Sequence, residues 1–211
     1  MRTKDAKKAS LVAAGLMAAA ASGARESAVQ RLIGRIKDGD PNVRTEAWLG
    51  AGEVGAPAVK PLADVMTDEN LEVARAAKRA LWRIVRLAGA PGADGRKEAV
   101  ERELIDLLRG RSPVAVSREV LWMLSEIGGR NSIRPIARSM RQKELLEDAR
   151  MVLERIPDKR AVRALKAAFE AVPEEFKSNI AQSLRKRGEE VAGYPCQKLV
   201  PTLKTNVKPV G

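Results

Sequence analysis

The sequence predicts an all-α fold: an α-α superhelix built from repeated helix pairs and followed by an extended C-terminal tail. Three observations predict it. A helical apolar stripe recurs about every thirty residues, turn residues separate the copies, and aromatic residues make up only 3% of the chain. A period of this size is typical of a solenoid, in which one unit cannot bury its apolar face alone. The low aromatic content predicts a core of small and branched aliphatic side chains.

The apolar stripe appears when five segments are aligned on one position, occupied by Val43, Val73, Val116, Leu145 and Phe176. The residues four positions later are apolar in every copy: Ala47, Ala77, Val120, Ala149 and Ile180. So are those eight positions later, which are Ala51, Leu81, Leu124, Leu153 and Leu184. Eleven positions later stand Val54, Ile84, Ile127 and Ile156, with Arg187 breaking the series. These offsets trace one face of a helix, which each copy is expected to bury.

Residues 1–24 form a basic and Ala-rich segment with two interpretations. Projecting the repeat one period back predicts a degenerate first repeat helix from about Ala13, with Met17, Ala21 and Ala24 buried. A second helix containing Val29 and Leu32 would follow. The alternative is a signal peptide, because a charged start, an apolar run and small residues at the end are typical of one. The apolar run is too short and too Ala-rich to span a membrane.

Residues 25–188 are expected to form the repeat array. Asp40-Pro41 begins a helix well, and Gly52 and Gly55 end it. Ala56-Pro57 opens its partner, which runs to about Met66. The third unit is longer than the others because of a loop at residues 89–95. Later turns fall at Gly128-Gly129 and Pro157-Asp158, and the pattern stops near Gly188.

Residues 189–211 are expected to be an extended tail. Its apolar side chains would either dock along the array or engage a partner, and disorder is the alternative. They are Leu199, Val200, Leu203 and Val207. Cys196 is the only cysteine and is interpreted as a passive thiol.

Charge and composition exclude several kinds of catalytic and metal site. Lys and Arg total 39 against 27 Asp and Glu, so the net charge is +12, which favours attraction to polyanions. The chain has no histidine, which excludes His-dependent triads and metal sites that need imidazole. We therefore predict no cofactor, metal site or catalytic constellation. A cytoplasmic location is expected, or export if residues 1–24 are a signal peptide.

The best repeat resembles a known family. Asp40, Val43-Arg44, Ala47, Gly52, Val54-Gly55 and then Val59-Lys60-Pro61-Leu62 are similar to HEAT repeats, especially the bacterial kind found in phycobilisome lyase subunits. The resemblance covers roughly residues 25–188. It implies a right-handed solenoid of about five to six helix pairs, whose second helices line a concave face. It implies little about activity, because the repeat serves many unrelated roles. The Asp40 and Arg44 pair resembles the family's inter-repeat polar contact and is interpreted as structural.

Basic residues supply the candidate binding sites. One stripe follows a predicted first helix: Arg75, Arg79, Arg83 and Arg86. A second stripe, Arg134, Arg138 and Arg141, lies where residues 128–143 carry five cations and no acid. The resemblance places the first stripe on an outer helix and the second on an inner one. A solvated charged face is the alternative for either.

A row across the repeats is also visible. Lys60, Arg134 and Arg163 each lie near the start of a predicted second helix, where a cation opposes the helix dipole. Repeating that choice beside helix N-termini would make an anion-binding row. The predicted partner- or anion-binding residues are therefore Lys60, Arg134, Arg138, Arg141 and Arg163. Trp48, Trp82 and Trp122 fall at different offsets of the repeat, which favours packing over a stacking platform.

Three functions are compatible with these features of the sequence. The first is a non-enzymatic scaffold that binds an acidic protein partner through its concave second-helix face. The second is nucleic-acid binding, including the HEAT-like alkylpurine DNA glycosylases, which the charge supports and the shortage of aromatics opposes. The third is a bilin lyase-like subunit, suggested by fold-level analogy alone. The HEAT-repeat deoxyhypusine hydroxylases are excluded because their iron site needs histidine.

Overall fold

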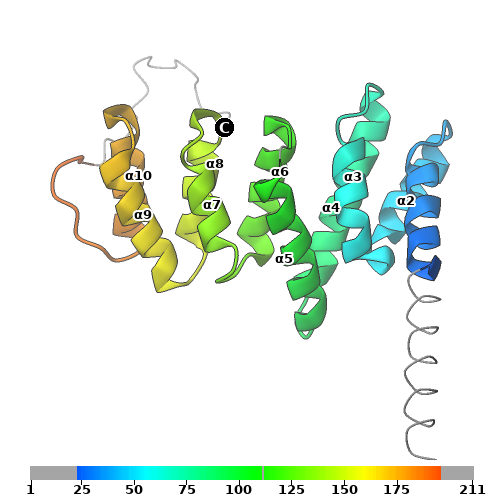
Figure 1. Cartoon of the computed structure of the whole chain (residues 1–211), viewed down its shortest axis with the longest axis horizontal. Coiled ribbons are helices and arrows are strands. Elements are labelled where there is room, and N and C mark those ends of the chain that lie inside the picture. The colour runs from blue at the N-terminus through cyan, green and yellow to red at the C-terminus, as the bar shows by residue number, and fades with distance from the viewer. Residues whose placement is uncertain (1–22, 111, 196–211) are drawn as a thin grey trace, which may run out of the picture.

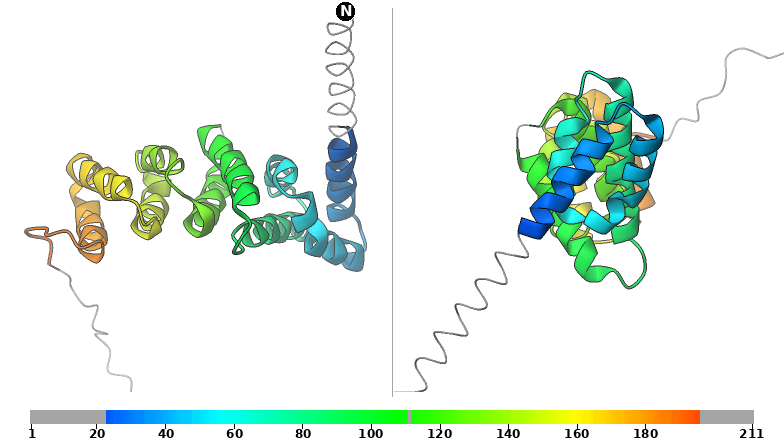
Figure 2. Two further views of the ribbon diagram at one scale, coloured as in Figure 1. Left: turned by 90° about the horizontal axis from the view of Figure 1, so that it is seen from below. Right: turned by 90° about the vertical axis from the view of Figure 1, so that its right-hand side faces the viewer.

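The computed structural model describes residues 23–110 and 112–195, which form an α-solenoid of two helix layers (Figure 1). One layer holds the first helix of each pair: α2 (Pro41–Val54), α4 (Leu71–Ala88), α6 (Val114–Ile127), α8 (Leu146–Arg155) and α10 (Glu174–Lys186). The other holds the second helices: α3 (Val59–Val65), α5 (Asp94–Arg109), α7 (Ile133–Ser139) and α9 (Lys159–Ala171). Each helix contacts the next one in its own layer, and Figure 2 shows the two layers. The all-α solenoid is confirmed, and its handedness stays a prediction.

Helix starts and ends follow the local sequence. The Asp40 side chain accepts a hydrogen bond from the Asn42 amide at 2.8 Å and caps α2, with Pro41 in its first turn. Gly55 ends the helix at a φ of +69°, a conformation that costs other residues energy, and a 3₁₀ turn at Ala56–Ala58 leads into α3. Arg44 does not pair with the Asp40 carboxylate. Its guanidinium instead donates to the carbonyls of Asp38 and Gly39, at 2.7 and 2.9 Å.

The predicted apolar stripe forms the first-helix side of the core, although Val43, Val54 and Phe176 are only half-buried. All ten residues at the offsets of four and eight are buried, as are Ile84, Ile127 and Ile156 at the offset of eleven. In the last copy, the half-buried Arg187 donates to main-chain carbonyls at the end of α8, including those of Glu154 (3.0 Å) and Ile156. Arg187, which interrupts the apolar series in the sequence, thus supplies hydrogen-bond donors to the carbonyls at the C-terminus of α8, which have no partners within the helix.

The N-terminal end agrees with the predicted frame only in part. Residues 23–36 are one helix, in which Leu32 is buried and Val29 half-buried, as expected of a second helix. Ala24 was expected in a buried position and is exposed. The other predictions for residues 1–22 lie outside the described residues.

The described part of the tail packs against α9 and α10. Arg185 donates to the carbonyls of Val191 (3.0 Å), Gly193 (2.6 Å) and Tyr194 (2.8 Å). The Tyr194 ring meets Phe169 edge to face at 5.4 Å, and its hydroxyl donates to Glu174. That hydrogen bond, with one from Lys177, holds the pKa of Glu174 below its usual value. The start of the tail therefore covers the end of the array, while residues 196–211, including Cys196 and the apolar tail residues, lie outside the described part.

Polar contacts join successive first helices. Glu119 on α6 accepts from Trp82 Nε1 on α4 at 3.2 Å and also pairs with Lys78. One junction further on, Asp148 on α8 accepts from Trp122 Nε1 at 3.1 Å and from Arg118 Nε at 2.9 Å. Trp48 and Trp82 pack against the core, as the sequence predicted. Trp82 and Trp122 also donate a hydrogen bond between first helices, which the sequence did not predict.

Candidate functional site

The second arginine stripe lines a groove of about 740 Å³ between α7 on one side and α9 and the start of α10 on the other. Helix α7 is short, and its buried residues Ile133, Ile136 and Ser139 face the core. Helical spacing then turns Arg134 and Arg138 to the opposite, exposed side. Arg141 and Lys143 follow in the next turn and complete the basic wall of the groove. We call these four residues, Arg134, Arg138, Arg141 and Lys143, the basic wall.

The basic wall has no internal counter-charge. Within residues 23–110 and 112–195, no salt bridge involves any of its four cations, although many other basic residues are paired. Glu175 is the single acid among the residues that line the groove. Four unpaired cations around one hollow attract an anionic group, and the hollow excludes part of the screening solvent.

The opposite wall is smooth and apolar. Ala164, Ala168 and Ala171 lie on one face of α9, and Val172 and Phe176 extend the wall toward α10. Small side chains let a partner backbone come close, as they do between packed helices. The groove therefore joins a charged wall to an apolar one, which is the composition expected of a site for an amphipathic segment.

The N-terminal end of α7 already has a carboxylate of this protein beside it. Glu101 on α5 is only 7% exposed and accepts hydrogen bonds from the Gly129 amide, at 2.8 Å, and from the Ser132 hydroxyl. Its negative charge lies where the helix dipole favours an anion. An external anion at this site would therefore meet the arginine side chains rather than the helix end. The sequence did not single out Glu101, because nothing in its own segment shows that α7 begins beside it.

The predicted cross-repeat row is not one continuous surface. Lys60 on α3 is exposed, pairs with Asp64 at 3.5 Å, and shares a small hollow with Glu103 and Asp106. Arg163 is exposed on α9 and does not line the groove. Of the five predicted residues, the structure brings together Arg134, Arg138 and Arg141.

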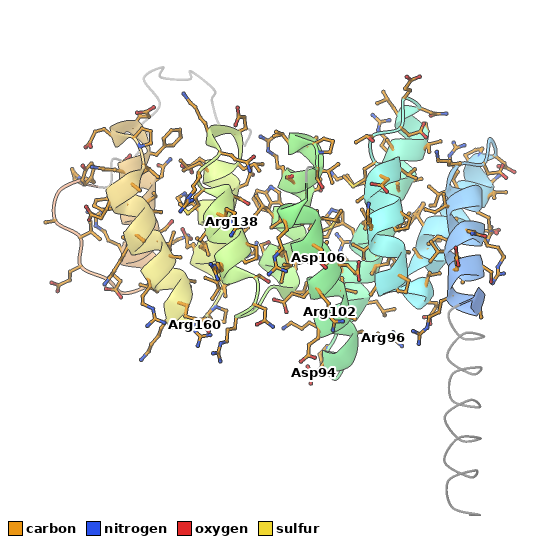
Figure 3. All side chains as sticks on the ribbon, in the orientation of Figure 1. Asp94, Arg96, Arg102, Asp106, Arg138 and Arg160 are labelled. Carbon is orange, nitrogen blue, oxygen red and sulfur yellow. The ribbon has the colours of Figure 1, made fainter. Side chains whose placement is uncertain are left out.

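The two halves of the second-helix layer differ in charge. The α5 sequence contains five acids and four cations: Asp94, Glu98, Glu101, Glu103 and Asp106, with Arg96, Lys97, Arg102 and Arg109. The α7 and α9 sequences contain six cations and one acid: Arg134, Arg138, Lys159, Arg160, Arg163 and Lys166, with Glu170. Figure 3 shows this contrast between the labelled residues of α5 and Arg138 and Arg160. An acidic partner would therefore meet attraction at α7 and α9 and a mixed field at α5.

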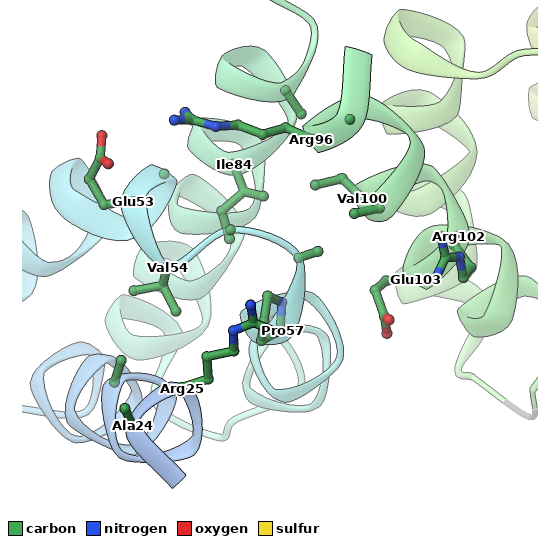
Figure 4. Close-up of a pocket in the computed structure, with 17 residues that line it drawn as sticks. Ala24, Arg25, Glu53, Val54, Pro57, Ile84, Arg96, Val100, Arg102 and Glu103 are labelled. Atoms are coloured by element: carbon green, nitrogen blue, oxygen red, sulfur yellow. The ribbon is translucent and has the colours of Figure 1, made fainter. Parts of the chain in front are cut away.

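A second cavity, of about 810 Å³, lies near the N-terminal end of the described chain (Figure 4). Arg25, Arg96 and Arg102 line it together with Glu53 and Glu103, among small residues from α2 to α5. Its charges are mixed, so they select no sign of ligand. In the described part of the chain, no three Cys, Asp or Glu side chains are grouped to hold a metal ion.

Comparison with known proteins identifies the repeat. The family model described as HEAT repeats matches residues 3–82. This match and the paired helices of the solenoid support its description as a HEAT-repeat protein. Beyond the matched part, α5 to α10 repeat the two-layer packing of α2 to α4. Membership of the phycobilisome-lyase kind stays a prediction.

Other comparisons add little to the HEAT assignment. A solved structure of an engineered protein from a structural genomics consortium is 20% identical and covers 75% of this chain and 78% of its own, with a TM-score of 0.39. At that TM-score the likeness supports no conclusion about function. No curated protein matches the chain. HEAT repeats are generally protein-interaction scaffolds. None of the helices described here is long and apolar enough to cross a membrane.

Proposed function

We propose that this HEAT-repeat protein is a non-enzymatic scaffold that binds an acidic segment of a partner protein in the groove between α7 and α9. The observation that carries the proposal is the basic wall: four cations without a salt bridge among the described residues, facing an alanine-rich wall on α9. Acidic side chains of the partner would pair with the arginines, and its apolar side chains would cover Ala164, Ala168 and Ala171.

The groove composition favours protein over nucleic acid. Phe176 is the one aromatic residue that lines it, whereas single-stranded nucleic acid is bound on several stacking side chains beside cations. Ten of the fifteen residues that line the groove are apolar and would stay uncovered against a phosphate backbone. Nothing in the groove or the second cavity supports the bilin lyase-like or DNA glycosylase-like alternative, and both stay hypotheses from the sequence.

The test is fluorescence anisotropy with a labelled peptide of alternating Glu and Leu residues at physiological salt. Saturable binding is expected, and Arg134→Glu with Arg138→Glu should weaken it at least about tenfold, since each reversal replaces attraction by repulsion. Arg25→Glu with Arg96→Glu is the matched control, because it changes the charge equally at two exposed residues of the other cavity. The control pair should bind as the wild type does.

Two outcomes contradict the proposal. Equal losses in both double variants would show that net charge, not the groove, attracts the peptide. Tighter binding of random DNA or RNA, with a salt slope that shows several phosphates neutralised, would favour nucleic-acid binding instead.

A further inference from the structure

The first-helix layer contains a polar motif that occurs three times. A cation is followed four residues later by tryptophan in α2, α4 and α6: Arg44 and Trp48, Lys78 and Trp82, Arg118 and Trp122. Residues four apart lie on the same face of a helix, so the cation and the tryptophan of each pair share a face. The three junctions can therefore be compared position by position.

Two of the junctions supply a carboxylate to this pair. Glu119 accepts from Trp82 Nε1 and pairs with Lys78, and Asp148 accepts from Trp122 Nε1 and Arg118. In both cases the two carboxylate oxygens take one donor each. The carboxylates are largely covered, with side-chain exposures of 20% and 16%. A carboxylate is thus the group that satisfies this motif inside the protein.

The junction between α2 and α4 has no such acid. Glu119 stands three residues before Trp122, and the residue three before Trp82 is Arg79. The Arg79 guanidinium lies over the Trp48 ring, 5.9 Å from its centre. Trp48 Nε1 is buried without a hydrogen-bond partner in the described residues, and Arg44 has turned to the carbonyls of Asp38 and Gly39.

We propose that Trp48 Nε1 and Arg79 form a binding site for a carboxylate side chain of a partner protein. The carboxylate would enter beside Trp48, accept its N–H, and pair with the guanidinium of Arg79, which would swing off the ring. Buried N–H groups without partners are rare, and charge-assisted hydrogen bonds to carboxylates are the strong ones. An anion from outside would replace the one that Glu119 and Asp148 supply at the other junctions.

The surroundings favour an acidic protein over a free anion. Arg79, Arg83 and Arg86 are exposed, and none of them forms a salt bridge with another described residue. Leu49, the next residue of α2, is 47% exposed and offers an apolar contact on the same helix. This site belongs to the first-helix layer and does not depend on the groove between α7 and α9.

Nuclear magnetic resonance can test the site, because the chain has three tryptophans and hence three indole N–H signals. The full chain, labelled with ¹⁵N, would be titrated with a hexaglutamate peptide, and Trp48→Phe would assign the signal. The Trp48 signal should move saturably, while those of Trp82 and Trp122 stay in place because internal carboxylates hold them. A Trp48 signal that does not move, or three signals that move together, would overturn the proposal.

A variant at position 79 separates this site from the groove. Arg79→Glu places a carboxylate where the other junctions have one, so the Trp48 signal should shift without peptide and then no longer respond. Arg79→Met should weaken the response at least fivefold, and unmoved Trp82 and Trp122 signals would show that the fold is kept. Undiminished responses in both variants would overturn the role of Arg79.

Two further titrations identify the class of ligand and distinguish the Trp48 site from the groove between α7 and α9. Inorganic phosphate and duplex DNA would be titrated in the same way, and a shift with either but not with the peptide would overturn the carboxylate assignment. Arg134→Glu with Arg138→Glu should leave the Trp48 response intact. Loss of the response in that variant would show that the two surfaces are not independent and would overturn the separate site.

Discussion

The α6–α8 and α2–α4 junctions use the same pair of donors and end in opposite states. Between α6 and α8, Asp148 accepts from both Arg118 and Trp122. Between α2 and α4, Arg79 stands in the place of the acid and Trp48 Nε1 has no partner among the described residues. Both junctions nevertheless bury the residues of the repeat stripe, such as Ala47, Ala77, Val120 and Ala149. Apolar burial therefore sets the spacing of the helices, and the polar contacts above it are free to differ.

Removing the acid should have the largest effect on this comparison. Asp148→Ala leaves the Trp122 N–H and the Arg118 guanidinium without their acceptor at a largely buried position, which costs about 1–3 kcal/mol of unfolding free energy. The equivalent change between α2 and α4, Arg79→Ala, removes a cation–π contact worth about 0.5–1 kcal/mol at an exposed site. Urea unfolding followed by circular dichroism measures both. Equal losses would mean that Asp148 acts through general surface charge.

Replacing the tryptophans should have a smaller effect on the free energy of unfolding, and the effect should differ between the two junctions. Trp122→Phe and Trp48→Phe lose similar ring area, but only the first breaks a hydrogen bond, and the second removes an unpartnered buried N–H. Trp122→Phe should therefore be less stable than Trp48→Phe by about 1 kcal/mol. Thermal unfolding of the two variants side by side gives the difference. A Trp48→Phe variant that loses as much as Trp122→Phe would show that Trp48 is already satisfied in solution.

The junction between α8 and α10 has no tryptophan and should show the smallest effect, which appears as a pH dependence. Glu154 is partly buried, which opposes its ionisation, but hydrogen bonds from Lys186 (2.8 Å) and Ser183 (2.7 Å) outweigh this and lower its pKa. A carboxyl whose pKa is lower in the folded state stabilises above its unfolded pKa, about 4.3 for Glu, and loses that contribution as the pH falls through the folded value. Glu154→Gln should therefore lose less stability than the wild type between pH 6 and pH 3. An identical acid dependence would contradict the assignment.

The tryptophan junctions were only partly visible in the sequence. Aligned on the apolar stripe, Trp48, Trp82 and Trp122 fall at offsets of five, nine and six and look scattered. Aligned on the preceding cation, each tryptophan follows it by four residues. In the next first helix, Arg79 stands three residues before Trp82, and Glu119 stands three residues before Trp122. The apolar alignment hides this signal, because the cation–tryptophan pair of α4 lies four residues, about one turn, further along the apolar register than that of α2, and the pair of α6 lies one residue further.

The sequence by itself determined the helices, their apolar faces and the basic face of α7. These follow from spacing along one helix, where residues three or four apart share a side, so Arg134, Arg138 and Arg141 were expected together. Only the tertiary structure decided what lies opposite them: the alanines of α9 across the groove, Glu101 under the start of α7, and Arg79 over Trp48. Those partners come from other helices, and their positions depend on how far each helix slides and rotates as the apolar stripes pack. Spacing along the chain does not encode that packing directly.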